Sequence, residues 1–172
     1  NARIHRFSAE GELLGSWGEP GSGPGQFNLP HGVWVADNRV FVADRENDRI
    51  QIFSLTGDLL DIWNHIQRPT DIYADGRGLL YVTSLPWRAG VAEFGHPPSQ
   101  YSLPGGVYVL DLDGNVLTRW GSGESCAPGG FVAPHGITVD SRGDLYVSEV
   151  TWTYGVRQGY VPEGCHALQK FA

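Results

Sequence analysis

The fold is decided by the stretch at residues 29–35, which reads Leu-Pro-His-Gly-Val-Trp-Val and recurs twice in altered form. Residues 133–139 read Ala-Pro-His-Gly-Ile-Thr-Val, and residues 68–74 read Arg-Pro-Thr-Asp-Ile-Tyr-Ala, with threonine in place of the histidine. Each copy leads into a turn and a second short run of apolar and aromatic residues, which is typical of a β-hairpin. Three successive units therefore begin with Pro-His, Pro-Thr and Pro-His.

The second half of each unit repeats as well. The pattern is a short strand, Gly, an acidic residue or Asn, two apolar residues and Trp. It occurs at residues 3–17, 49–63 and 107–120, and it begins again at residue 168. A complete unit thus supplies four short strands, the arrangement of a propeller blade. We expect an all-β chain of about thirteen short strands, in which Trp17, Trp63 and Trp120 hold equivalent positions.

The repeats predict how the chain is divided into blades. They indicate a half blade at residues 1–17, a blade at 30–63, a blade at 69–120 with an insertion at 85–105, and a blade lacking its last strand at 134–171. That makes about three to three and a half four-stranded blades. Because a propeller removes its exposed strand edges only by closing its ring, we expect missing chain or a second copy to complete this one.

Composition and charge exclude several classes of protein. The 172 residues carry a formal net charge of −7 with no basic cluster, which argues against nucleic acid as the main partner. There is no apolar run of the roughly eighteen residues that a membrane span needs, and no charged-then-apolar leader. Neither a membrane segment nor a signal peptide is therefore visible, and the sequence leaves the cellular compartment undetermined.

Two cysteines lie in the last blade. Cys126 precedes its first strand and Cys165 precedes its third strand, so both loops fall on the same face of the blade. The sequence permits either a disulfide or two separate thiols at these positions. A disulfide would favour a secreted or periplasmic protein.

The two Pro-His pairs are the candidate metal site. His31 and His135 each begin the innermost strand of a blade, and these blades are separated by the one that carries Thr70. In a six-bladed ring, alternate blades lie about 120° apart, so three such histidines would converge on the axis and hold one zinc ion. Only two of the three are in this chain. The alternative is that Pro-His-Gly forms only a strand-entry turn, and the other four histidines have no matching positions.

Two insertions are expected on the same face as the Pro-His pairs. They cover residues 85–105 and about 150–165. Long insertions in compact domains often serve a binding site. Their notable side chains are Pro86, Trp87, Arg88, Tyr101, Trp152, Tyr154 and Tyr160. These residues either roof a pocket or pack within their own loops.

Residues 16–19, 24–31 and 42–53 together resemble NHL-repeat propellers. The chain is more closely similar to the lyase domain of the peptidylglycine alpha-amidating enzymes and of their bacterial relatives. The similarity covers essentially the whole chain and matches the C-terminal half of that six-bladed domain. The succession of His31, Thr70 and His135, followed by Ala-Asp-Arg at residues 43–45, is its most specific part.

The resemblance implies roles for three residues. His31 and His135 match two of three zinc ligands in the family, and Arg45 matches an arginine that lines the active site. The third ligand, the catalytic tyrosine and a second arginine would precede Asn1, so the isolated chain is expected to be inactive. The family's structural calcium uses an aspartate directly after the last histidine ligand, where this chain has Gly136, which makes calcium doubtful.

The reaction implied by the resemblance is cleavage of a peptidyl-alpha-hydroxyglycine to a peptide amide and glyoxylate. Arg45 would then hold the substrate carboxylate through two parallel hydrogen bonds. From the sequence alone, Arg45 could instead pair with Asp44, Glu46 or Asp48. The alternative function is a non-catalytic propeller that binds a peptide, a protein or a carbohydrate through its aromatic loops. The substrate, the native length and the oligomeric state are left open.

Overall fold

The computed structural model describes residues 2–121, 123 and 125–172. The chain folds as two compact units, Asn1–Pro69 and Thr70–Ala172. Within the described residues, thirteen strands form four antiparallel sheets of two to four strands, and the α-helix α1 (Thr151–Tyr154) has four residues. This confirms the predicted all-β fold. None of the described helices is long and apolar enough to cross a membrane.

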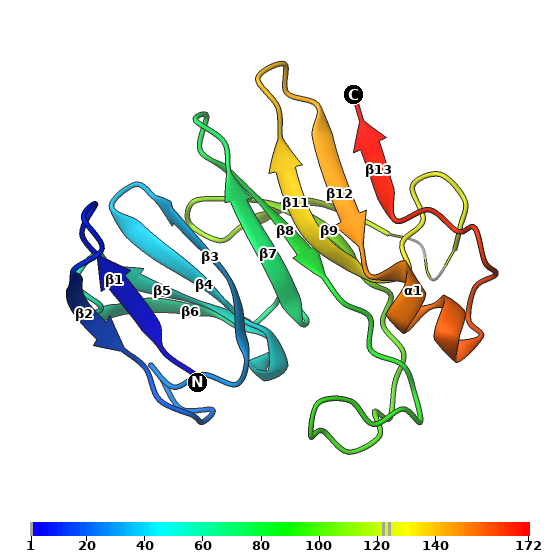
Figure 1. The fold of residues 1–172 in the computed structure, drawn as a ribbon, viewed down its shortest axis with the longest axis horizontal. Helices are drawn as coiled ribbons and strands as arrows, with labels where there is room; N and C mark the ends of the chain where they lie inside the picture. The colour runs from blue at the N-terminus through cyan, green and yellow to red at the C-terminus, as the bar shows by residue number, and fades with distance from the viewer. Residues whose placement is uncertain (1, 122, 124) are drawn as a thin grey trace. The chain divides into compact units, whose positions relative to one another are not determined.

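The first unit contains a two-stranded and a four-stranded sheet (Figure 1). The small sheet is formed by β1 (Ile4–Phe7) and β2 (Leu13–Trp17). The large sheet has the order β3 (Pro30–Ala36), β4 (Arg39–Asp44), β5 (Arg49–Ser54) and β6 (Leu59–Trp63). The 3₁₀ turn η1 (Arg45–Asn47) joins β4 to β5. Phe27, Val40, Val42 and Phe53 form the buried core between the sheets, with Trp17 packed against them.

The second unit contains a four-stranded and a three-stranded sheet (Figure 1). The first is formed by β7 (Pro69–Ala74), β8 (Leu79–Ser84), β9 (Gly106–Asp111) and β10 (Val116–Trp120). The second is formed by β11 (Pro134–Val139), β12 (Leu145–Glu149) and β13 (Leu168–Phe171). The helix α1 and the 3₁₀ turn η2 (Val156–Gln158) lie between β12 and β13. The core includes Phe131, Ile137 and Val147.

The register of the strands confirms that the three tryptophans are equivalent. Trp17, Trp63 and Trp120 each end a fourth strand and lie opposite the apolar residues Ile4, Ile50 and Val107 of the third strand. The indole groups differ in one contact. Nε1 of Trp63 donates to Oδ2 of Asp61 at 2.9 Å. The Nε1 atoms of Trp17 and Trp120 are buried and have no hydrogen-bond partner within the described chain.

This difference leads to a prediction about stability. Asp61→Ala is expected to lower the free energy of unfolding by about 1 kcal/mol, because it leaves a third buried indole N–H without an acceptor. Thr118 occupies the position of Asp61 two residues before Trp120, so Thr118→Ala is the matched control and should cost less. Urea unfolding of both variants, followed by tryptophan fluorescence, measures the two values. Equal costs would show that the Asp61 bond contributes nothing.

Candidate functional site

Arg45 lies directly after β4 in η1, and its side chain is buried. Its Nε donates to Oε1 of Glu46 at 2.7 Å, in an ion pair whose side chains are 5% and 0% exposed. The pairing with Glu46, one of the alternatives open from the sequence, is therefore present. Because this bond uses Nε, a bidentate hold on a substrate carboxylate would have to use the two terminal nitrogens of Arg45.

Glu46 also binds a second arginine. Nη2 of Arg68 lies 3.2 Å from the same Oε1 atom, and the Arg68 side chain is wholly buried. The backbone of Arg68 is in the left-handed region, with φ of 32°, and its N–H donates to Oδ1 of Asp48 at 2.8 Å. Sequence reasoning missed Arg68. Its only signal was a charged residue before the proline at a position where the two Pro-His units have Leu29 and Ala133.

His31 and His135 share one local backbone arrangement. Pro30 lies opposite Asp44 and Gly32 opposite Ala43, with a shift of register between them, so that His31 stands at a bulge. Pro134 lies opposite Glu149 and Gly136 opposite Ser148, which places His135 at the same bulge. A bulge re-aims the side chain of the extra residue. Both histidines are half-buried.

Thr70 replaces the histidine in the blade between them and is buried. Its Oγ1 lies 2.9 Å from Oγ1 of Thr83 and 3.1 Å from the carbonyl oxygen of Pro134. Oγ1 of Thr83 in turn lies 3.3 Å from the carbonyl oxygen of His135. Two threonines of one blade thus contact the backbone carbonyl groups of Pro134 and His135.

Sequence reasoning also missed a carboxylate that anchors each Pro-His strand. Asp44, the last residue of β4, accepts bonds from the Asn28 N–H at 2.8 Å and from Nε of Arg49 at 2.7 Å. Gln51 donates to Oδ2 of Asp44 at 3.1 Å and to the Gln26 carbonyl at 2.7 Å. The loop that enters β3 is therefore fixed to the middle of the same blade.

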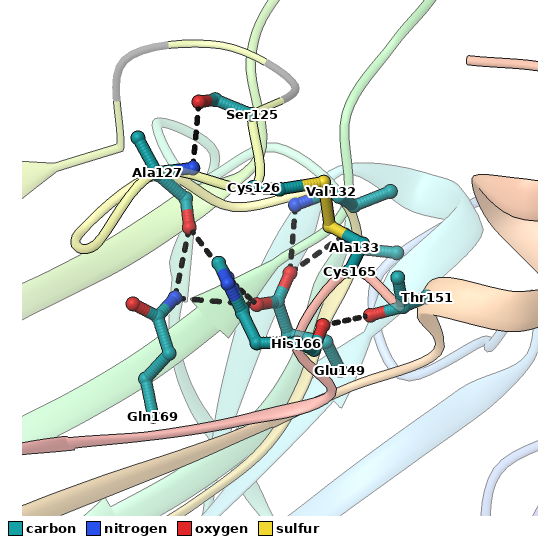
Figure 2. Close-up of a disulfide and its surroundings, with 11 residues drawn as sticks. Ser125, Cys126, Ala127, Val132, Ala133, Glu149, Thr151, Cys165, His166 and Gln169 are labelled. Atoms are coloured by element: carbon teal, nitrogen blue, oxygen red, sulfur yellow. Dashed lines mark hydrogen bonds and ion pairs between the residues drawn. A yellow bond between two sulfur atoms is a disulfide. The ribbon is translucent and has the colours of Figure 1, made fainter. Parts of the chain in front are cut away.

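The last blade repeats this arrangement with Glu149 and Gln169 (Figure 2). Oε2 of Glu149 accepts from the N–H groups of Val132 at 2.6 Å and Ala133 at 3.1 Å. Gln169 donates to Oε1 of Glu149 at 3.3 Å, and to the carbonyl of Gly130 at 2.8 Å. One sequence signal was Pro-Gly-x-Phe before both Pro-His strands, at residues 24–27 and 128–131.

Cys126 and Cys165 form a disulfide beside this cluster, with Cα atoms 5.2 Å apart (Figure 2). The bridge confirms the first of the two possibilities that the sequence permitted. It ties the loop before β11 to the loop before β13. Nε2 of the neighbouring His166 lies 3.1 Å from Oε1 of Glu149, at the end of β12, and 3.3 Å from the carbonyl oxygen of Gly130. The contact with Gly130 joins the same two loops as the disulfide.

Burial raises the pKa of the Glu149 carboxyl above its ordinary value of 4.5. A group with a raised pKa in the folded state stabilises the protein below its unfolded pKa and loses that contribution as the pH rises through the folded pKa. The free energy of unfolding of the wild type should therefore fall relative to that of Glu149→Gln as the pH rises from about 4.5. Urea unfolding across this range tests the slope, and parallel pH profiles would contradict it.

The two insertions contact each other through Arg88. Nη2 of Arg88 donates to the carbonyl of Tyr154 at 3.0 Å, and its guanidinium carbon lies 4.3 Å from the ring centre of Tyr160. Trp87 is buried and packs edge-on against His96 within its own loop. Trp152 and Tyr101 are exposed. The aromatic residues thus divide into rings that pack the loops and rings that face solvent.

Comparisons with known proteins agree with this geometry. The NHL repeat family matches residues 27–53. Peptidyl-glycine alpha-amidating monooxygenase A of Xenopus laevis is 31% identical over 157 residues, which are 87% of this chain and 16% of that protein. Human NHL repeat-containing protein 3 is 45% identical over 67 residues, covering 38% of this chain and 19% of that protein. Hydrazine synthase of Kuenenia stuttgartiensis aligns with a TM-score of 0.60 at 11% identity, over 86% of this chain and 36% of that one.

The chain is a partial NHL-type β-propeller. It resembles the amidating enzyme, but it spans less than a fifth of the length of either relative. The distant structural match shows the fold alone. In this NHL-type propeller the repeat matched by the family contains His31, Asp44, Arg45 and Gln51.

Two of the described histidines are the candidate metal ligands. Imidazole nitrogens are donors that zinc accepts, and His31 and His135 stand at equivalent bulges. His31 belongs to the first unit and His135 to the second. No group of three or more His, Cys, Asp or Glu side chains is placed to hold a metal ion within residues 2–121, 123 and 125–172.

Proposed function

We propose that the propeller to which these residues contribute is a zinc-dependent lyase that acts on peptides ending in alpha-hydroxyglycine. The observation that carries the proposal is the pair of histidines at matching bulges, in a chain 31% identical to an amidating monooxygenase over 157 residues. In this proposal His31 and His135 supply two of the metal ligands. The bound zinc would act as a Lewis acid on the hydroxyl or carboxylate oxygen of the substrate.

The remaining chemistry assigns a role to Arg45. Its terminal nitrogens would hold the substrate carboxylate, while Glu46 fixes the guanidinium through Nε. A base from outside the described residues would remove the hydroxyl proton. The C–N bond would then break, with a proton passing to the amide nitrogen, to give the peptide amide and glyoxylate.

The test combines metal content with ligand binding. His31→Ala and His135→Ala are each expected to lose bound zinc, measured by elemental analysis after dialysis. Arg45→Ala is expected to keep its zinc and to bind glyoxylate at least about tenfold more weakly in calorimetry, because it loses a charged hydrogen-bond pair. The exposed Arg142 provides a matched control, and Arg142→Ala should change neither value. These measurements use the intact propeller, and an intact wild-type propeller that binds no zinc and releases no glyoxylate from a peptide ending in alpha-hydroxyglycine would contradict the proposal.

A second function is favoured by the exposed aromatic side chains. Trp152 and Tyr101 lie on the two insertions and face solvent, and Arg45 is already held in a buried ion pair. These features fit a non-catalytic propeller that binds a peptide, a protein or a carbohydrate. Metal-free protein that binds a peptide, and loses it in Trp152→Ala, would favour this function over the lyase.

A further inference from the structure

Each of the strands β3, β7 and β11 has a characteristic pair of residues directly after its proline. The pairs in chain order are His-Gly at 31–32, Thr-Asp at 70–71 and His-Gly at 135–136. Histidine therefore comes with glycine, and threonine comes with aspartate. Because β7 and β11 belong to the same unit, the structure shows how the Thr-Asp pair meets the His-Gly pair of the next blade.

Asp71 connects β7 to the backbone of β11. Its Oδ2 accepts a hydrogen bond from the N–H of Ile137 at 3.1 Å, and its Oδ1 accepts one from the N–H of Ile72 at 2.9 Å. Ile137 is the second residue after His135. A carboxylate that accepts from a backbone N–H forms a charge-assisted hydrogen bond, which is stronger than a neutral one. The carboxylate of Asp71 therefore joins the inner strands of two neighbouring blades.

The glycine after His135 leaves room for this contact. A Cβ atom on Gly136 would lie 2.6 Å from Oγ of Ser148 and 3.8 Å from Oδ2 of Asp71. The first distance is well inside van der Waals contact, so a side chain at position 136 would require Ser148 to move. The His-Gly pair of β11 and the Thr-Asp pair of β7 are thus complementary in shape as well as in hydrogen bonding.

Thr70 and Thr83 contact the backbone on the other side of the bulge. Oγ1 of Thr70 donates to the carbonyl oxygen of Pro134 at 3.1 Å, and Oγ1 of Thr83 donates to that of His135 at 3.3 Å. Both threonines are wholly buried. Oγ1 of Thr83 also accepts the N–H of Asp71 at 3.2 Å, so the three residues form one network. The network contacts the backbone directly before His135, at His135 and two residues after it.

These contacts support a weak point of the β11–β12 ladder. The register shifts between Pro134 and Gly136, and the extra residue of such a bulge is left unpaired. The direction of the His135 ring therefore depends on how the backbone on both sides of it is held. Support of this kind matters for metal ligands, because loss of a residue that orients a ligand weakens metal binding by roughly 10- to 100-fold.

We propose that Thr70, Asp71 and Thr83 are positioning residues that orient the imidazole ring of His135 for metal binding. The middle blade contributes no ligand of its own, and its Thr-Asp pair holds the ligand of the next blade. This role rests on the proposed function, because it takes His135 as a zinc ligand. It adds to that function the residues that set the affinity for the metal.

The zinc affinity of the intact propeller, measured by competition with a chromophoric chelator, is the first test. Thr83→Val keeps the shape of the side chain but removes the hydroxyl, and it should raise the zinc dissociation constant by about tenfold or more. Thr83→Ser restores the hydroxyl and should recover most of the affinity.

Thr151→Val is the matched control for this test. Thr151 is also buried, and its Oγ1 donates at 2.7 Å to the carbonyl oxygen of His166, which is not a proposed ligand (Figure 2). The control variant should therefore keep the zinc affinity of the wild type. Equal weakening by Thr83→Val and Thr151→Val, or no rescue by Thr83→Ser, would overturn the positioning role.

The metal-free propeller provides a second test by nuclear magnetic resonance. In Asp71→Ala, the amide of Ile137 should exchange with deuterium about tenfold faster or more, because it loses a hydrogen bond to a charged group. The imidazole signals of His135 should shift, whereas those of His166 should not. Asp71→Ala and Thr83→Val remove different atoms of the network, so a failure of one variant to fold leaves the other to be measured.

The two tests separate the positioning role from the proposed function. A wild-type propeller that binds no zinc would overturn the proposed function. A wild-type propeller that binds zinc, with His135 signals unchanged in the folded Asp71→Ala and Thr83→Val variants, would overturn the positioning role alone.

Discussion

Glu46→Ala is expected to lower the free energy of unfolding by about 3–5 kcal/mol, because it leaves two buried guanidinium groups without the carboxylate that they share. The side chains of Arg45 and Arg68 are 5% and 0% exposed, so both guanidinium groups are shielded from bulk water. Breaking one partner of a buried pair costs the desolvation of the charge that remains. Urea unfolding followed by tryptophan fluorescence measures the loss.

Two further variants separate charge from shape. Glu46→Gln keeps an oxygen acceptor for Nε of Arg45 but removes the negative charge. We expect it to lower the free energy of unfolding, but by less than Glu46→Ala does. Asp37→Ala breaks the Arg39–Asp37 pair, whose contact is 3.0 Å and whose aspartate side chain is 65% exposed. Its cost should stay within about 1 kcal/mol. Equal costs for Glu46→Ala and Asp37→Ala would show that Glu46 does not hold the two arginines in the fold.

The strands could be predicted from the sequence because their signal is local. Apolar alternation, the turn residues and the recurring tryptophans depend only on neighbouring residues, and the structure places Trp17, Trp63 and Trp120 in one register. The same repeat identified His31 and His135 as equivalent. Their roles as ligands, and that of Arg45 toward a substrate, stay predictions.

The buried polar contacts could not be predicted, because they depend on which loops meet in space. Asp44 and Gln51 are seven residues apart, yet Gln51 also holds the loop at Gln26. Arg68 reaches Glu46 across 22 residues. No periodic pattern of apolar residues predicts these contacts between loops. Asp44 and Glu149, however, occupy matching strand ends, so an alignment of the repeats could have paired them. Aligning the blades with one another therefore finds these buried carboxylates, which a single motif does not.

Removal of the disulfide is expected to cost about 4 kcal/mol of unfolding free energy. The bridge joins Cys126 to Cys165 across a sequence separation of 39 residues, and closing a loop of this length restricts the unfolded chain by roughly that amount. The double variant Cys126→Ser with Cys165→Ser avoids a reactive thiol. Its cost is measured by urea unfolding beside the oxidised wild type.

The position of the bridge predicts which part of the chain loosens in that variant. Without the disulfide, Glu149 and His166 remain as the polar link beside the loop that enters β13 (Figure 2). Limited proteolysis should therefore cut residues 150–165 faster in the double serine variant, while residues 85–105, which the bridge does not close, should be cut at the wild-type rate. Equal acceleration in both insertions would mean that the bridge stabilises the whole unit and not this loop.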